Sequence, residues 1–212
     1  MTRSSSAVIA GIDEAGRGAL AGPVVAAACV LNAVSLHPLI RDSKQLTPEE
    51  REEAFCWIAS HCAYGIGLVE AQDIDKNGIL AATEKAMQIA VRELSEIMEP
   101  TYLLVDGRDK FWFNLPHSSL IRGDEIEPCI SAASIVAKVT RDRLMTEYAR
   151  KWPTFGFDDH KGYGVPQHLE AIRQHGASPL HRQTFLRNLF ASITPAAATT
   201  TRAERRRGRV AP

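Results

Sequence analysis

The chain lacks the segments that would place it in a membrane. No run of eighteen apolar residues occurs, and the longest candidate, AGPVVAAACVL at 21–31, is interrupted by Pro23 and is too short to span a bilayer. The N-terminal residues, MTRSSSAVIAGIDEAG, reach two acids before the apolar core of a signal peptide can form. We therefore expect a cytoplasmic protein without membrane association.

Cysteine is scarce and follows no pattern. The four cysteines, at positions 29, 56, 62 and 129, form no C-x-x-C pair. This spacing argues against a disulfide framework or a zinc site. We expect the four side chains to be small apolar fillers in a reducing compartment.

The chain also lacks a net charge, since 25 lysines and arginines balance 25 aspartates and glutamates. That balance neither indicates nor excludes a nucleic-acid partner. The charge is unevenly placed, because residues 202–212, RAERRRGRVAP, contain five arginines and one glutamate. We expect residues 191–212 to form a disordered tail. It either touches nucleic acid or another anionic surface, or is solvated without a specific partner.

What is present predicts an α/β domain over residues 1–190. The length of 212 residues, with 45% hydrophobic content, suffices for one core. Apolar stretches predict strands at 7–12, 23–31, 63–69, 102–105 and 119–121. Helices are predicted at 77–97, 128–152, 166–175 and 182–190, and the capping box TPEE at 47–50 begins another that runs to about residue 61. The first strands should be hairpin partners, and the small residues ISAAS at 130–134 should pack closely on the sheet.

Acidic residues follow three of the predicted strands. Asp13 and Glu14 follow 7–12, Asp106 follows 102–105, and Asp124 follows the segment SSLIRG. An acid at a strand end is usually a solvated turn residue, but neighbouring strand ends also bring their next residues together. Carboxylates held together repel one another and need a counter-charge. An all-oxygen set suits Mg²⁺ or Mn²⁺ better than zinc.

The glycines beside these acids have two interpretations. GRGALA at 16–21 fits the dinucleotide-binding pattern G-x-G-x-x-[GA], with Asp42 downstream. That pattern should open a helix, whereas a strand follows here, and the two acids would repel a pyrophosphate. The alternative is a loop whose backbone approaches a ligand closely and offers amide groups and Arg17 as donors. Such a loop beside a metal site suits a phosphodiester and its sugar.

A series of longer segments resembles bacterial ribonuclease HII. They are GIDEAGRG and GPVV, DSKQLT at 42–47, LLVDG at 103–107, GDEIEPCISAASIVAKVTRDR at 123–143 and HKGYGVPQHLEAI at 160–172. The resemblance covers about residues 8–190. It implies an RNase H-like fold, a mixed sheet flanked by helices, with a small C-terminal helical extension that binds substrate. The implied activity is cleavage of the RNA strand in RNA–DNA hybrids and at single ribonucleotides in duplex DNA, as in ribonucleotide excision repair.

The resemblance also implies roles for particular residues. The catalytic, metal-binding carboxylates are Asp13, Glu14, Asp106 and Asp124, which hold two Mg²⁺ or Mn²⁺ ions. The ions would drive an in-line displacement that leaves a 5′-phosphate and a 3′-hydroxyl. The implied substrate-binding residues are Gly16, Arg17, Gly18, Ser43, Lys44 and Tyr163. The first three look like the family's GRG loop, which recognises the ribose 2′-OH. The tyrosine looks like the one that stacks on the next deoxyribose, and the serine and lysine match a segment at the substrate backbone.

Other residues are left with two interpretations. Lys138, Arg141 and Arg143 on the long predicted helix either meet phosphates or are solvated. The seven histidines are scattered and are expected to be structural or exposed. Val165 and Thr184 depart from the family's commoner Thr and Ser.

Three alternatives to this nuclease are weaker. An inactive nucleic-acid-binding relative would lack one of the four acids, and none is missing. The sister family, ribonuclease HIII, has an additional N-terminal domain for which this sequence has no room. A nucleotide-cofactor oxidoreductase would need a helix directly after Gly18. The expected partners are RNA–DNA hybrids and DNA containing ribonucleotides, and nothing in the sequence demands more than a monomer.

Overall fold

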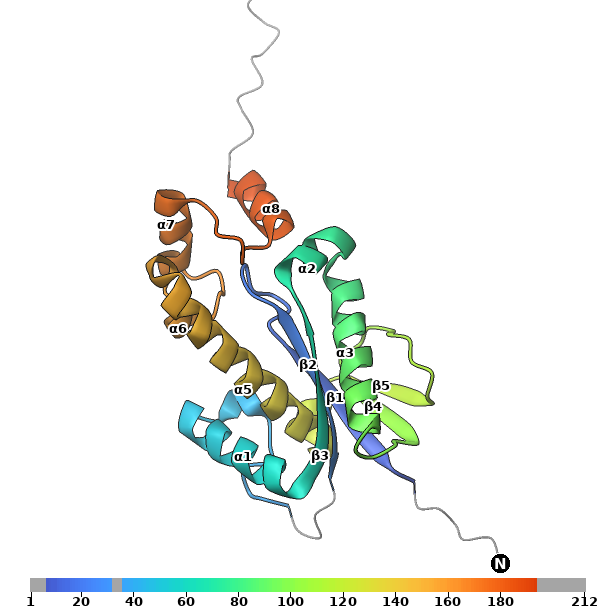
Figure 1. Cartoon of the computed structure of the whole chain (residues 1–212). Helices are drawn as coiled ribbons and strands as arrows, with labels where there is room; N and C mark the ends of the chain where they lie inside the picture. The colour runs from blue at the N-terminus through green and yellow to red at the C-terminus, as the bar shows by residue number, and fades with distance from the viewer. Residues whose placement is uncertain (1–6, 32–35, 194–212) are drawn as a thin grey trace, which may run out of the picture.

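A mixed five-stranded sheet forms the centre of the molecule. The computed structural model describes residues 7–31 and 36–193. The strand order is β3-β2-β1-β4-β5 (Figure 1). The strands are β1 Ile9–Ala15, β2 Val24–Leu31, β3 Cys62–Val69, β4 Tyr102–Asp106 and β5 His117–Leu120. The first three pair antiparallel, as the predicted hairpins do, and β4 and β5 add in parallel. The predicted α/β class is confirmed.

Helices cover both faces of the sheet. α3 (Ile79–Ser95) packs on one face, while α5 (Pro128–Lys151) crosses the other with α1 (Pro48–His61) beside it (Figure 1). The other helical segments are η1 Ser43–Gln45, α2 Ala71–Asn77, α4 Gly123–Ile126, η2 Pro153–Phe155, α6 Phe157–His160, α7 Pro166–His175 and α8 Gln183–Ile193. A third apolar cluster joins the last turns of α5 to α7 and α8. Across the described residues, no helix has the length and hydropathy needed to cross a membrane.

The strongest local signals predicted the helix ends correctly. The capping box before α1 is formed, because the Glu50 amide donates to Thr47 Oγ1 at 3.2 Å and the Thr47 amide donates to Glu50 Oε2 at 2.8 Å. α5 ends at Lys151, two residues before Pro153, which cannot continue a helix.

Several boundaries differ from the prediction. The helix predicted at 77–97 is α3 and begins at Ile79, after Gly78 with φ +82°, while the short helix α2 before that glycine was not predicted. The strand predicted at 7–12 runs on to Ala15, so the first two acids lie within it. α8 extends to Ile193, and the rest of the predicted tail lies outside the described residues.

None of the four cysteines, which all lie within the described residues, forms a disulfide, and they differ in their surroundings. Cys29 and Cys129 are buried as expected, but Cys56 is exposed, so the prediction that it fills apolar space is wrong. Cys56 lies on α1, whose buried side chains are Ala54 and Ile58.

α5 lies directly against β1 at Gly11. A Cβ atom on this glycine would lie 2.2 Å from the backbone carbonyl carbon of Cys129. The next residues of α5, Ser131 to Ser134, are small and buried, so the predicted close packing of this segment is confirmed. The missing side chain therefore sets the distance between the sheet and the helix that flanks Asp13.

Replacing Gly11 should separate these two elements. We expect Gly11→Ala to lower the free energy of unfolding by about 3 kcal/mol, or the melting temperature by roughly 10 °C, because backbone must move to admit the methyl group. Gly18→Ala is the matched control, since a Cβ there meets nothing within 4 Å. Thermal unfolding followed by circular dichroism measures both, and equal melting temperatures would contradict the packing described.

Candidate active site

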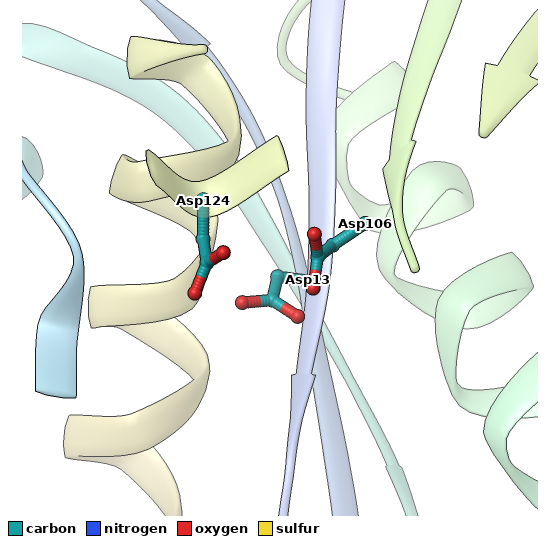
Figure 2. A group of neighbouring side chains, drawn as sticks. All are labelled: Asp13, Asp106 and Asp124. Carbon is teal, nitrogen blue, oxygen red and sulfur yellow. The ribbon is translucent and has the colours of Figure 1, made fainter. Parts of the chain in front are cut away.

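Three aspartates from different elements meet at one end of the sheet. Each of Asp13, Asp106 and Asp124 offers an oxygen, and these oxygens all lie within 4.8 Å of one another (Figure 2). β1 and β4 are parallel neighbours with Ile12 paired to Val105, so the following residues, Asp13 and Asp106, lie side by side. Alternation along a strand points both to the α5 face. The convergence predicted from the strand ends is confirmed.

Asp124 reaches this site from a helix instead of a strand. β5 ends at Leu120, and Asp124 is the second residue of the short helix α4. The backbone amide of Gly123 donates to Asp106 Oδ1 at 2.7 Å, and Ser131 Oγ donates to the carbonyl of Asp124 at 2.7 Å. These two bonds hold α4 between β4 and α5.

Glu14 is not one of the three converging acids. Because it follows Asp13 within β1, its side chain leaves the strand on the opposite face. It accepts a hydrogen bond from Arg17 Nη1 at 3.3 Å, while Arg17 Nη2 donates to Asp109 Oδ2 at 2.5 Å. Glu14 therefore lines the same cavity as Asp13 without joining the cluster of three aspartates.

The cluster is electrostatically unfavourable without a cation. Burial raises the pKa of Asp13 well above its usual value, and the charges of Glu14 and Asp106 raise it further. Burial and the charge of Asp124 also raise the pKa of Asp106. Lys44 Nζ donates to Asp124 Oδ2 at 2.8 Å, and this bond raises the pKa of the lysine. One ammonium group cannot balance three carboxylates, and a set of carboxylate oxygens fits a hard divalent cation.

Most of the predicted site residues line one cavity of about 300 Å³. Asp124 lies beside it, linked through Lys44. Tyr163 is 37% exposed there, and the glycines around Arg17 form another part of the wall. The predicted residues in this wall are Asp13, Glu14, Gly16, Arg17, Gly18, Ser43, Lys44, Asp106 and Tyr163. Segments far apart in the sequence thus share one concave surface.

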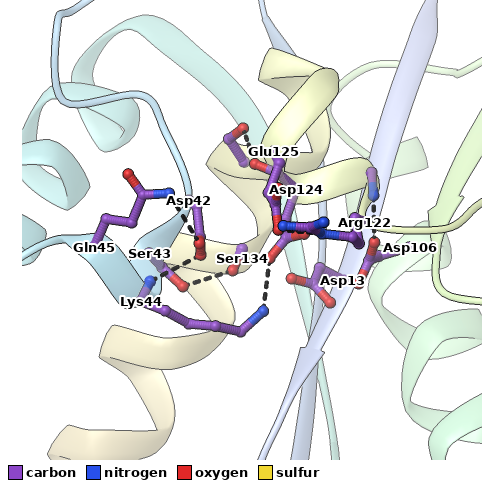
Figure 3. A network of polar contacts seen from close by, with 12 residues as sticks. Asp13, Asp42, Ser43, Lys44, Gln45, Asp106, Arg122, Asp124, Glu125 and Ser134 are labelled. Carbon is purple, nitrogen blue, oxygen red and sulfur yellow. Dashed lines mark hydrogen bonds and ion pairs between the residues drawn. The ribbon is translucent and has the colours of Figure 1, made fainter.

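The sequence assigned no role at this site to Ser134 or Asp109, and it left Lys138 with two interpretations. Ser134 Oγ is 2.7 Å from Ser43 Oγ, so it joins η1 to α5 beside the carboxylates (Figure 3). Lys138 lines the cavity one turn further along α5, where it pairs with Asp142 at 2.7 Å. The polar side chain of Ser134 on the sheet-facing side of a helix was a usable signal. Asp109, the partner of Arg17, lies in a loop, and no sequence pattern indicated its role.

Three histidines form a structural cluster behind Tyr163. His168 and His181 are buried, with their Nε2 atoms 3.0 Å apart, and the ring of His160 stacks on His168 at 4.4 Å. His168 Nδ1 lies 2.8 Å from the carbonyl oxygen of Tyr163. Burial lowers the pKa of both His168 and His181 to about 4. The expectation that histidines here are structural is confirmed for these three.

Comparison with known proteins gives matches to ribonuclease HII over most of the chain. The family model described as Ribonuclease HII matches residues 10–193. Ribonuclease HII of Geobacillus kaustophilus is 52% identical over 178 residues, which are 84% of this chain and 67% of that protein. Ribonuclease HII of Geobacter metallireducens is 47% identical over 187 residues, 87% of this chain and 86% of that one. The crystal structure of the ribonuclease H2 from Pyrococcus horikoshii has a TM-score of 0.71 at 28% identity and covers 87% of this chain and 97% of its own.

Neutralising Asp13 should relieve repulsion among the acids. We expect Asp13→Asn to melt at or above the wild-type temperature in EDTA, because a buried charge is removed and the amide oxygen still accepts hydrogen bonds. Added Mg²⁺ should raise the melting temperature of the wild type more than that of the variant. A large loss of stability in EDTA would show that Asp13 is a structural residue.

The histidine cluster should make stability fall in mild acid. The unfolded chain takes up protons below about pH 6.5, whereas His168 and His181 stay neutral in the folded protein down to about pH 4. The free energy of unfolding should therefore fall between these two values as pH decreases. Denaturant titrations at several pH values should show a shallower fall for His168→Phe, and an unchanged one for the exposed control His175→Phe. Equal slopes in all three proteins would contradict the assignment.

Proposed function

This chain belongs to the ribonuclease HII family and is a metal-dependent ribonuclease H, and we propose that it cuts both RNA–DNA hybrids and single ribonucleotides in duplex DNA. The observation that supports this best is the shared cavity. It joins a buried carboxylate cluster, suited to phosphodiester hydrolysis, to a glycine-flanked loop and a tyrosine, suited to inspecting a sugar. The substrate class follows from the family, and the finer substrate preference is the proposal.

Two divalent ions, Mg²⁺ or Mn²⁺, are the proposed cofactor. Asp13, Asp106 and Asp124 would hold them, with Glu14 reaching in from the rim of the cavity. When bound, the ions supply Lewis-acid activation of the attacking water and neutralise charge on the departing 3′ oxygen. The raised pKa values of Asp13 and Asp106 agree with this donor set, because a bound cation favours the charged form that burial and neighbouring acids disfavour.

The chain's own residues would select and orient the substrate. Backbone amides of residues 16–18 would donate to the ribose 2′ oxygen, which is the group that separates RNA from DNA. The partly exposed ring of Tyr163 would stack on the following deoxyribose. Ser43 and Lys44 would contact the phosphate backbone, and the helices α6 to α8 would extend the binding surface. Hydrolysis would leave a 5′-phosphate on the ribonucleotide and a 3′-hydroxyl upstream.

Cleavage of three labelled duplexes tests this proposal. With Mg²⁺ we expect cutting immediately 5′ of a single embedded ribonucleotide and within a continuous RNA–DNA hybrid, none in all-DNA duplex, and no cutting in EDTA. Asp13→Asn should reduce the rate by about a thousandfold or more, while Asp73→Asn, a matched change on α2, should not. Cutting of the continuous hybrid alone would contradict the sugar-reading role of the loop. No cutting at all would support an inactive binding protein.

A further inference from the structure

Two arginines lie fully buried beneath the loop that would read the ribose. Arg141 on α5 and Arg182 before α8 are each 0% exposed. Among the residues that the structure describes, neither forms an ion pair with a carboxylate. Burial, together with the charge of Arg141, lowers the pKa of Arg182 to about 9. Unpaired buried charges are costly, so an arrangement that keeps two of them needs an explanation. Sequence analysis left two interpretations for Arg141, phosphate contact or solvation, and its complete burial contradicts both.

Arg182 binds the backbone of the substrate loop through every arm of its guanidinium group. Nη2 donates to the carbonyl of Gly16 at 2.8 Å, and Nη1 donates to the carbonyl of Arg17 at 2.9 Å. Nε and Nη2 both donate to the carbonyl of Gly22, at 3.0 and 2.9 Å. The peptide bonds are trans, so each amide points away from the carbonyl of the residue before it. The carbonyls of Gly16 and Arg17 point toward Arg182. The backbone amides of Arg17 and Gly18 therefore point away from it.

Arg141 ties the same loop to the segment that carries Tyr163. Its Nη2 and Nε donate to the carbonyls of Ala21 and Pro23, and its Nη1 donates to the carbonyl of Lys161, each at 3.0 Å. The guanidinium carbon lies 5.4 Å from the centroid of the Tyr163 ring. The two segments that would hold ribose and deoxyribose are thus fastened to one side chain.

The glycine before Arg17 leaves room for this arrangement. Gly16 has φ +87°, and a Cβ atom on it would lie 1.8 Å from Arg141 Nε. A side chain at this position would displace the guanidinium group. The first glycine of the motif is therefore accounted for by the buried arginine beneath it.

We propose that Arg182 and Arg141 are positioning residues that preset the loop of residues 16–23 for recognition of the ribose 2′-OH. This inference rests on the proposed function. The planar fork of arginine meets several carbonyls at fixed angles, which the point-like ammonium of lysine cannot do. The same two buried charges add a positive field beneath the place where the phosphodiester would lie.

The test compares binding of two duplexes that differ by one hydroxyl group. Fluorescence anisotropy with Ca²⁺ in place of Mg²⁺ measures Kd for an all-DNA duplex and for the same duplex with one ribonucleotide. We expect Arg182→Lys to lower the wild-type preference for the ribonucleotide by about tenfold, as for loss of one oriented hydrogen bond. Binding of all-DNA duplex should change little, and the exposed control Arg92→Lys should retain the full preference.

The outcomes distinguish a positioning role of the two arginines from a purely structural one. A folded Arg182→Lys that keeps the wild-type preference overturns the proposal, because the arginine then serves stability alone. If that variant does not fold, Arg141→Lys is measured in the same way, and an unchanged preference in it overturns the proposal. If the wild-type protein cleaves hybrids but binds both duplexes equally well, the loop does not recognise the ribose 2′-OH. The positioning role of the two arginines is then overturned as well. The proposal is supported if Arg182→Lys loses the preference for the ribonucleotide while Mg²⁺ still raises its melting temperature as in the wild type. The carboxylates are then undisturbed, and the change is confined to the loop.

Discussion

Repulsion among three closely spaced carboxylates, two of them buried, is the constraint around which this molecule is arranged. Asp13, Asp106 and Asp124 would separate if their backbones were free, because like charges in a poorly hydrated site raise one another's energy. They stay together because β1 and β4 are paired in the sheet and because α4 is held by bonds to Asp106 and from Ser131. The contact of Gly11 with α5 brings the helix close enough for these bonds. A divalent cation bound among the three side chains would offset this repulsion.

The substrate side of the cavity is built on a different principle. Its loop carries little side-chain volume, and its shape is held by donors from below, chiefly Arg141 and Arg182. Histidines 160, 168 and 181 support the segment around Tyr163 in a similar way, since one of them lies against the tyrosine's own carbonyl. Both loops are thereby fixed through backbone atoms, which leaves their amides and the tyrosine ring available to a ligand. Rigid support of this kind reduces the entropy lost when a substrate binds.

Much of the fold was predictable because its signals are local. The capping box at Thr47, the stop at Pro153 and the apolar strands each depend on residues within a few positions of one another. Predictions were less accurate for short elements, as for α2, a helix of seven residues that was not predicted and that ends at Gly78. Glu14 shows a different limit within a strand, because two adjacent acids were expected at a strand end and alternation along β1 instead sends them to opposite faces.

By itself, the sequence determined the α/β class, the three aspartates that converge and, by resemblance, the family and the residues proposed to contact substrate. It could do so because those features appear as contiguous motifs. Only the tertiary structure decided that Asp124 arrives on a helix, that Ser134 and Lys138 join the cavity wall, and that Arg141 and Arg182 lie buried under a loop more than a hundred residues away in sequence. Those partners are backbone carbonyls, which every residue possesses, so no side-chain pattern in the sequence can reveal them.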